Sequence, residues 1–324
     1  GRTPEELAAT PPTPLSDRHG LPPYFFERSD GVLLAAFNSW REFDLDAPEL
    51  HRILQDDDLR RFLSAFRLAK GPAAFRPESD LRALLGLDPG TVDTVGLIQP
   101  VTVLKSQDGA RTWMPFGRVA GDPRTGTGCA FRGNMIEVAG EILFSAYWAD
   151  QGDSRPTVFL MRSRDGGATW DVKSPIARPW AANNGSETHL YRHPSGRITA
   201  LMRTTVRCLA LAHSDDNGAT WTPPTVTTVH GFPCHALAHS SGRVLLTYAQ
   251  RTPPPATKGK LICPDLADIE KAEEFVIDRY AEPTASGGGY PSAVELDDGT
   301  VLVVYFSRRT PYGPPWVCGR RMEL

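Results

Sequence analysis

The chain has 324 residues, of which 40% are hydrophobic, enough to form a large core in one or two domains. Its 29 glycines and 29 prolines favour many turns and short strands over long helices. The net charge of −3 gives no electrostatic basis for binding nucleic acid or an anionic membrane. No apolar run is long enough to span a bilayer and no signal peptide is visible, so a secreted or periplasmic location would require a leader that has been removed.

In chain order, five segments consist of an apolar strand, a tight turn with glycine and a second apolar strand. They cover residues 24–37, 134–144, 190–201, 236–248 and 292–305. This pattern predicts five β-hairpins, with their turns at Gly31, Gly140, Gly196, Gly242 and Gly299. The gap between the first two hairpins is about twice as long as the later gaps.

A second motif, S-x-D-x-G-x-T-W, alternates with these hairpins. It occupies residues 163–170 and 214–221, and residues 106–113 depart from it at Ala110. In such a turn Asp and Ser accept hydrogen bonds from backbone amides, Gly permits positive φ, and Trp packs beneath. One hairpin and one such turn give four strands, which is a propeller blade. The sequence therefore predicts an all-β propeller with five visible blades.

The long first gap holds either a degraded sixth blade or an insertion, and its pattern favours an insertion. Residues 48–70 repeat large apolar residues at helical spacing, and residues 79–85 fit a second short helix with Ser79 or Asp80 as its cap. We therefore expect one propeller domain over residues 1–324 with a helical insertion near 46–90.

Cysteine and histidine spacing gives no indication of a metal site. The five cysteines are odd in number and form no C-x-x-C pair, which predicts free thiols. His189 and His193, like His235 and His239, are four residues apart but fall on predicted strands or turns. We expect neither a metal nor a cofactor.

Polar residues at equivalent places beside the hairpins are the candidates for a ligand site near the propeller axis. Glu187 directly precedes one hairpin, and Arg203 ends its second strand. Arg251 ends the corresponding strand one blade later, and Tyr290 opens the blade after that. Arg132 opens the blade before Glu187. The order of these residues across successive blades indicates a shared site.

With these residues the chain resembles the sialidase (neuraminidase) superfamily, from about residue 120 to residue 310. The repeated turns are similar to the family's Asp-boxes. The segment from Glu187 to Arg203 is similar to the one that carries a Glu and the second arginine, and Arg251 and Tyr290 follow in the order of the third arginine and the nucleophilic tyrosine. Phe131-Arg132 looks like half of the F-R-I-P motif, with Gly-Asn in place of Ile-Pro. The resemblance implies six blades.

The family's chemistry gives these residue types a reason. A sialic acid carries a carboxylate on its anomeric carbon, which arginines bind as bidentate, permanently charged groups. An anionic nucleophile would be repelled there, so a neutral tyrosine serves instead, with a carboxylate as its base. The resemblance thus makes Tyr290 the nucleophile and Glu187 its base, with Arg132, Arg203 and Arg251 binding the carboxylate.

An aspartate must also assist the leaving group and activate water. If Arg132 is the family's first arginine, Asp150 and Asp153 are the candidates. If the family's first blade instead maps to residues 21–40, Asp44 or Asp46 takes this role.

The expected function is an exo-acting retaining glycoside hydrolase that cleaves a terminal sialic acid or a related acidic sugar. His235 is a further candidate for lining the pocket. Two alternatives stay open: a propeller polysaccharide lyase or uronate-specific glycosidase, with Tyr290 or His235 as acid and base, and a glycan-binding propeller without catalysis. The expected partner is an acidic sugar or glycan, with no nucleic acid and no membrane span, and the oligomeric state is not predicted.

Overall fold

The computed structural model describes residues 23–38, 40–44, 48, 94–98, 101–119, 129–149, 155–181, 183–280, 288–307 and 316–324. The fold is all-β, and none of the elements assigned within these residues is a helix. Over the same residues no helix is long and apolar enough to cross a membrane. The helical insertion predicted over 46–90 lies outside this part of the chain, apart from Pro48, which has helical conformation.

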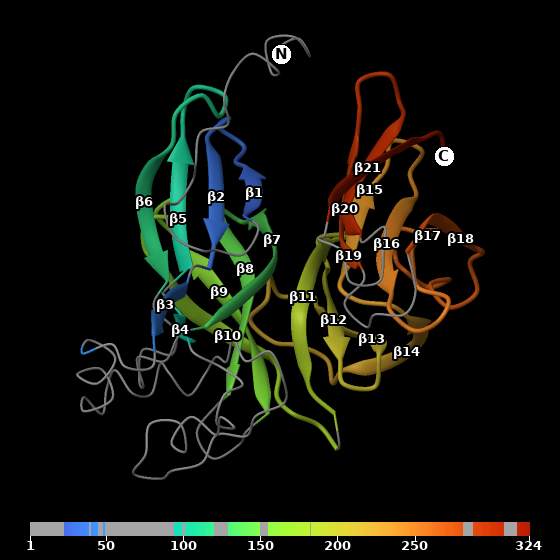
Figure 1. Ribbon diagram of the computed structural model, residues 1–324, viewed down its shortest axis with the longest axis horizontal. Coiled ribbons are helices and arrows are strands. Elements are labelled where there is room, and N and C mark those ends of the chain that lie inside the picture. Colours follow the sequence, from blue (N-terminus) through green and yellow to red (C-terminus); the bar gives the residue numbers. More distant parts are fainter. Residues whose placement is uncertain are drawn as a thin grey trace. The chain divides into compact units, whose positions relative to one another are not determined.

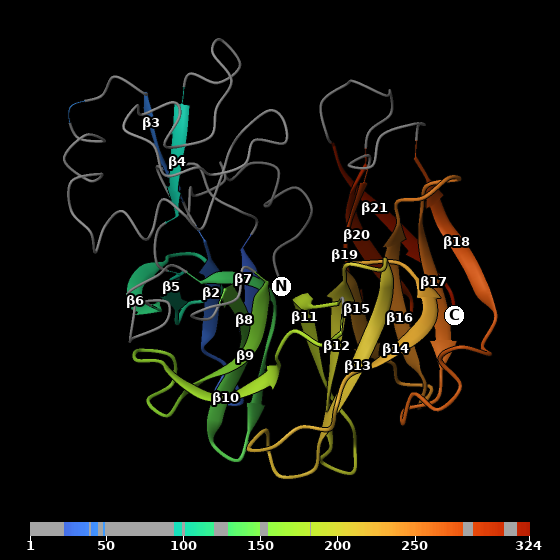
Figure 2. The ribbon, with the colours of Figure 1, turned by 90° about the horizontal axis from the view of Figure 1, so that it is seen from below.

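The fold is that of a β-propeller, and the described residues contain five antiparallel blade sheets of three or four strands, whose strands are labelled in Figures 1 and 2. The number agrees with the five blades counted in the sequence, and the sixth blade that the resemblance implied does not appear among the described residues. The predicted hairpins are confirmed, and each turn glycine has positive φ as a tight turn requires.

The chain divides into two compact units, of which the first comprises Gly1–Ala130 and Asp165–Trp170. Its blade has the strand order β1-β2-β5-β6. These strands are β1 (Tyr24–Glu27), β2 (Leu33–Phe37), β5 (Val101–Ser106) and β6 (Met114–Val119). Between β2 and β5 the chain forms a separate two-stranded sheet, β3 (Trp40–Asp44) with β4 (Thr94–Ile98). The long first gap therefore begins and ends in the strands of a two-stranded sheet that is separate from the blade sheets.

The second unit comprises Phe131–Arg164 and Asp171–Leu324 and contains the other four blades. The second blade has β7 (Ala130–Val138), β8 (Glu141–Ala149), β9 (Pro156–Ser163) and β10 (Asp171–Ala177). The third has β11 (Gly185–Arg192), β12 (Ile198–Thr204), β13 (Cys208–Ser214) and β14 (Thr225–His230). The fourth has β15 (Cys234–Ala238), β16 (Val244–Gln250), β17 (Ala256–Ile262) and β18 (Glu274–Arg279). The fifth has β19 (Gly288–Glu295), β20 (Val301–Ser307) and β21 (Trp316–Met322).

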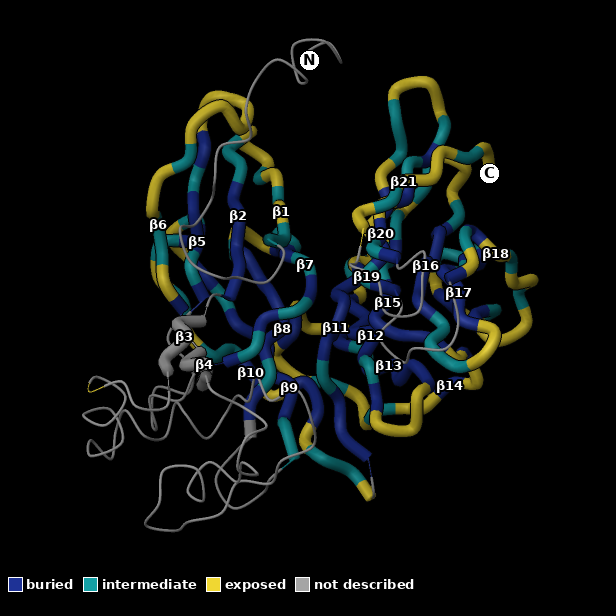
Figure 3. Tube along the Cα trace, in the orientation of Figure 1, coloured by how far each residue is buried: buried dark blue, intermediate teal, exposed yellow. Residues whose placement is uncertain are grey.

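The middle strands of the third and fourth blades are apolar on both faces because each of these two blades packs against a neighbour on either side. Successive side chains of a strand point to opposite faces. Accordingly Ala200 and Met202 of β12 join a core cluster with Leu160 of the second blade, whereas Leu201 joins a cluster with Leu246 of the fourth. Figure 3 shows β12 and β16 as almost continuously buried. These clusters fix neighbouring blades of this unit against one another and so determine where their strand ends lie.

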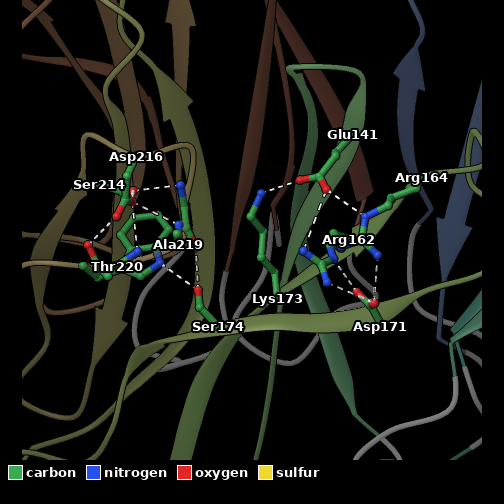
Figure 4. A network of polar contacts seen from close by, with 12 residues as sticks. Glu141, Arg162, Arg164, Asp171, Lys173, Ser174, Ser214, Asp216, Ala219 and Thr220 are labelled. Carbon is green, nitrogen blue, oxygen red and sulfur yellow. Dashed lines mark hydrogen bonds and ion pairs between the residues drawn. The ribbon is translucent and has the colours of Figure 1, made fainter.

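The Asp-box turn between β13 and β14 is held by its aspartate (Figure 4). The Asp216 carboxylate accepts hydrogen bonds from the amides of Ala219 and Thr220 at 3.0 and 2.9 Å, and from the hydroxyls of Ser214 and Thr220 at 2.7 and 2.6 Å. The Trp221 indole donates to the Ser174 hydroxyl on β10, at 3.1 Å. This turn therefore also anchors the third blade to the second.

The other Asp-boxes lie in the first unit and have the same geometry. Asp108 accepts from the amides of Arg111 and Thr112 at 3.0 and 2.9 Å, and Asp165 accepts from those of Ala168 and Thr169 at 3.0 and 2.9 Å. These hydrogen bonds pull the pKa of the Asp108 carboxyl below its ordinary range, with the Thr112 hydroxyl as the largest cause. The motif is thus a self-contained turn built around an ionised aspartate.

Replacing Asp216 by alanine is expected to lower the melting temperature by several degrees at neutral pH, because four hydrogen bonds lose their acceptor. The Thr220 hydroxyl is the main cause that holds the pKa of Asp216 below its ordinary value of 3.8. A depressed carboxyl pKa contributes stability that is complete above the unfolded-state pKa and is lost as the pH falls below it. The difference between wild type and variant should therefore shrink below about pH 4, as calorimetry can measure.

The neighbouring Asp215 provides the matched control because it forms only an exposed ion pair with Arg197, which contributes little. Asp215→Ala should melt close to the wild-type temperature. The structural role assigned to Asp216 would be wrong if both variants melted alike.

Candidate active site

The second unit brings a carboxylate, a tyrosine and an arginine into one hydrogen-bonded chain. The Tyr290 hydroxyl donates to Oε1 of Glu187, and Nη1 of Arg203 donates to Oε2 of the same carboxylate at 2.7 Å. Glu187 is buried, with 6% of its surface exposed. A buried carboxylate is tolerated when its oxygens are paired in this way. The arrangement gives Glu187 one neutral and one cationic partner.

A β-bulge directs Glu187 toward this position. In the pairing of β11 with β12, Ser186 lies opposite Arg203 and Thr188 lies opposite Met202, so Glu187 is the extra residue. A bulge bends the strand and re-aims the side chain that it carries. The sequence pattern of the hairpin alone does not reveal this irregularity.

Tyr290 sits in a second irregularity, near the start of β19. Its backbone φ is +53°, which is uncommon for a bulky residue, and the ladder shifts register between Gly289 and Ser292. Gly289 has a φ of +141°, and a Cβ there would lie 3.1 Å from Nη2 of Arg251. The tyrosine ring stacks on Phe306, with their centroids 5.9 Å apart. Glycine and local strain thus place the tyrosine against Arg251 and toward Glu187.

The other two predicted arginines flank the tyrosine ring. The guanidinium carbon of Arg132 lies 5.1 Å from the centroid of the Tyr290 ring, and that of Arg251 lies 5.6 Å from it. Nε of Arg251 is buried and has no hydrogen-bond partner among the described residues. Arg203 lies over the ring of Phe232, at 4.5 Å. The structure therefore gathers all three arginines around the pair formed by Tyr290 and Glu187.

The departure from the F-R-I-P motif has a structural cause where β7 meets β11. A Cβ at Gly133 would approach the carbonyl oxygen of Thr188 to 2.1 Å, so the close contact of the two strands requires glycine. Asn134 donates from Nδ2 to the carbonyl of Leu190 and accepts from the Leu190 amide, both at 2.8 Å. This docking sets Arg132 next to the strand that carries Glu187.

Burial raises the pKa of Tyr290 to about 12, with the charge and hydrogen bond of Glu187 acting in the same direction and the charges of Arg132 and Arg251 opposing it. The hydroxyl is therefore protonated at neutral pH and is the donor in its bond to Glu187. Burial alone would lower the pKa of Arg203, but the Glu187 carboxylate raises it above its ordinary value. The arginine stays charged beside the carboxylate.

Tyr147 is a member of this environment that the sequence analysis missed. Burial raises the pKa of its hydroxyl well above the ordinary value, and the charge of Glu187 adds to the shift. Its position on β8 resembles that of many other strand aromatics, so no sequence signal distinguishes it. Tyr147 is therefore a neutral aromatic residue close to the charges of Glu187, Arg132 and Arg203.

A pocket opens beside Arg203 and Arg251. Its lining comprises Arg203, Arg207, His230, Gly231, Phe232, Arg251 and Thr252. The sequence analysis identified only the two arginines, because Arg207 lies in an ordinary hairpin turn and His230 at the end of an outer strand. The pocket is therefore cationic over a longer stretch than the resemblance indicated.

His235 is not part of this lining. Its ring lies 4.7 Å from that of His189, between centroids, and its Nδ1 is buried without a partner among the described residues. The other ring, through Nε2, lies 3.2 Å from the carbonyl oxygen of Ala236. His189 is buried and His235 is half-buried, and the two rings form a pair between β11 and β15.

The candidate acid/base aspartates cannot be placed in this geometry. Asp150, Asp153 and Asp46 lie outside the described residues, and Asp44 is the last residue of β3. All five cysteines are free, and no group of three or more potential metal ligands occurs in the part of the chain that the structure describes.

The sequence matches the BNR repeat-like domain family over residues 65–303. The chain belongs to this family. The Asp-box turns described above are the repeats of a BNR propeller. None of the curated proteins compared with it matches its sequence significantly.

Several solved structures share the BNR propeller fold. A protein of unknown function from Dyadobacter fermentans is 26% identical over 93% of this chain and 76% of that one, with a TM-score of 0.72. The NanB sialidase of Streptococcus pneumoniae is 12% identical over 94% of this chain, which spans 56% of the sialidase, with a TM-score of 0.60. The α-L-arabinofuranosidase Arb93a of Fusarium graminearum is 14% identical over 97% of this chain and 83% of that one, with a TM-score of 0.59. At such low identity the two enzymes establish a shared fold, on which glycoside hydrolases of different specificity occur.

The histidine pair should make stability depend on pH. Burial lowers the pKa of His235 to about 4 and lowers that of His189 as well. A histidine with a depressed folded-state pKa binds fewer protons than the unfolded chain, so stability is lost as the pH falls from about 6.5 toward 4. His235→Gln, which cannot take up a proton, should reduce that loss by on the order of 1–3 kcal/mol, as measured by denaturant unfolding at several pH values.

His193 is the control for this experiment, because its ring bonds to Ser195 within a hairpin turn instead of another histidine. His193→Gln should leave the pH dependence unchanged. An unchanged slope in His235→Gln would show that the histidine pair does not govern it.

Proposed function

We propose that this protein is an exo-acting retaining glycoside hydrolase of the sialidase type, which removes a terminal sialic acid or a related acidic sugar. The observation that carries the proposal is the chain from Tyr290 through Glu187 to Arg203, with Arg132 and Arg251 on the tyrosine ring. The relatives on the same fold support hydrolysis of glycosides as the general chemistry.

In the first step, the Tyr290 oxygen attacks the anomeric carbon while Glu187 takes its proton. A C–O bond to the tyrosine forms, the glycosidic bond breaks, and the leaving oxygen receives a proton from an acid. Because the pKa of Tyr290 is raised to about 12, the phenolate does not form beforehand, and the proton must move to Glu187 during the attack. In the second step, water replaces the tyrosine and the configuration is retained.

The three arginines would hold the carboxylate of the sugar. Glu187 engages only Nη1 of Arg203 in the hydrogen bonds of the described residues, and Nε of Arg251 is buried without a partner there. A ligand carboxylate beside these groups would satisfy them with charge-assisted hydrogen bonds. The sugar carboxylate held by these cations would repel an anionic nucleophile, which explains why a neutral tyrosine suits this site.

The acid that protonates the leaving group is one of Asp150, Asp153, Asp44 and Asp46. Which aspartate acts depends on which residue of this chain corresponds to the first arginine of the sialidase family. Arg132, on β7, lies over the ring of Tyr290, which favours Arg132 as that first arginine. The acid is then Asp150 or Asp153, which follow the neighbouring strand β8.

Replacing Tyr290 by phenylalanine should reduce turnover of an aryl sialoside by at least about a hundredfold, because the nucleophile is lost. A fluorinated sialic acid should label the wild-type protein at Tyr290 and leave Tyr290→Phe unlabelled, as mass spectrometry of the peptides can show. Nuclear magnetic resonance of the first product should show retained configuration.

Tyr191→Phe is the control, since Tyr191 is a buried tyrosine on β11 outside the site. A product with inverted configuration or a new double bond would replace the proposal with an inverting hydrolase or a lyase. Binding of acidic sugars without any turnover of sialosides or uronates would indicate a glycan-binding propeller.

Arg251→Ala should weaken binding of a sialic acid by about 2–4 kcal/mol, the scale for losing one partner of a desolvated charge pair. Calorimetric titration would measure this, with Arg192→Ala as control because that exposed arginine bonds only to the carbonyl of Glu137. Equal affinities of the two variants would exclude Arg251 from carboxylate recognition.

A further inference from the structure

The cationic pocket continues beyond the residues that the proposed reaction uses. Arg203 is the last residue but one of β12, Arg207 follows in the turn to β13, and His230 ends β14. These strands are consecutive in the third blade, with the order β11-β12-β13-β14. The lining therefore runs from Arg203 across one end of the blade, away from the strand that carries Glu187.

The charge of this lining exceeds what one carboxylate can neutralise. It contains Arg203, Arg207 and Arg251 together with His230, and no acidic residue. Glu187 is the acidic partner of Arg203, and it already shares its charge with the Tyr290 hydroxyl. One carboxylate bound between Arg203 and Arg251 would leave the outer cation, Arg207, without a counter-charge in the pocket.

The backbone of Arg207 gives an independent reason to assign it a role. Its φ is +65°, in the left-handed region that favours glycine or asparagine and is strained for other residues. The turn is well anchored, because the Thr204 hydroxyl donates to the Cys208 carbonyl at 2.6 Å, and the Thr205 amide and hydroxyl bond to Asn183. An arginine at a position that glycine would fill at lower energy points to a function for its side chain.

The rest of the lining is held rigidly. His230 pairs with Cys208, the residue after Arg207, and its Nδ1 lies 3.6 Å from the cysteine sulfur. A Cβ at Gly231 would lie 2.1 Å from the ring of Tyr248, so Gly231 and the adjoining Phe232 are fixed against the fourth blade. The backbone that carries Arg207 and His230 is therefore anchored, which reduces the ordering cost of binding an anion there.

We propose that Arg207 and His230 form a second anion subsite, and that the natural substrate is an acidic glycan with a second anionic group next to the first carboxylate. Arg207 supplies a permanent charge and a planar fork of donors, and His230 supplies a ring N–H. The second anion belongs either to the same terminal sugar, as a sulfate ester would, or to the next sugar of the chain, as a second carboxylate would. This inference rests on the proposed function, because it takes the first carboxylate to lie between Arg203 and Arg251.

The test compares ligands that differ in the number and place of their anionic groups. The ligands are monomeric sialic acid, a sulfated sialic acid and a sialic acid dimer, titrated into the Tyr290→Phe protein so that none is consumed. Arg207→Gln, added to this background, should weaken binding of at least one dianionic ligand about tenfold or more and that of the monomer less than about twofold, since a hydrogen bond to a charged group contributes about 1.5–3 kcal/mol. The ligand that loses affinity identifies where the second anion sits.

Two further variants separate recognition from folding. Arg207→Gly relieves the positive φ, so it should melt no lower than the parent and still lose the dianionic ligand to the same extent. Arg197→Gln, which removes an exposed ion pair with Asp215 at the far end of β12, should change no affinity.

The outcomes distinguish this inference from the proposed function. Equal loss of monomer and dianions, or no loss, in Arg207→Gln would overturn the second subsite and leave the sialidase proposal standing. If the parent protein binds no sialic acid, the sialidase proposal fails. The same titrations are then repeated with glucuronic acid as the monoanion and a diuronate as the dianion. A selective loss of the diuronate would then support the subsite, and the absence of binding by every acidic sugar would overturn both.

Discussion

Burial of the Glu187 carboxylate is the constraint on which the site depends. A carboxylate with 6% exposure needs both oxygens paired, and its partners come from β12 and β19, on two different blades. Removing either partner would leave an unbalanced charge or an unpaired oxygen in the interior. The positions of Tyr290 and Arg203 are therefore tied together through one side chain, although 87 residues separate them in the chain (290 − 203).

The site residues lie where the regular backbone of the strands and turns is interrupted, at bulges and at residues with positive φ. Glu187 is the extra residue of a bulge, Tyr290 has positive φ beside another register shift, and Arg207 has positive φ in a hairpin turn. Regular strands would point these side chains along the faces of the blades, into the cores between them. Each irregularity costs stability locally, and the apolar clusters between neighbouring blades of the second unit compensate for it.

The sequence predicted what depends on local chemistry and missed what depends on packing between blades. Hairpin glycines and Asp-box turns form from interactions within a few residues, so their patterns were sufficient. Glu187, Arg203 and Tyr290 were found from their equivalent places beside the predicted hairpins, and the family resemblance supplied their roles. The sixth blade implied by the same resemblance does not appear among the described residues, in which the long first gap begins and ends in the two-stranded sheet of β3 and β4.

Contacts between distant parts of the chain left no such pattern. Phe232 and Tyr147 reach the site because adjacent blades pack closely, and hydrophobic periodicity gives the face of a residue but not its neighbour on another blade. The replacement of Ile-Pro by Gly133-Asn134 looked like a weakness of the resemblance. The structure explains the replacement, because the carbonyl oxygen of Thr188 lies so close to residue 133 that it excludes any side chain there.

The amide side chain of Asn134 has a wider consequence for the edge of the third blade. β11 is an edge strand, and Leu190 lies in it opposite Ala200 with its own N–H and C=O turned away from β12 toward Asn134. Unpaired backbone groups of this kind can template the addition of a foreign strand, the usual beginning of aggregation in β proteins. The side-chain amide of Asn134 makes the two hydrogen bonds to Leu190 that a peptide group of a neighbouring strand would make. At Leu190 the edge is thereby closed to pairing with another chain without continuing the sheet, and the two blades stay separate elements joined through side chains.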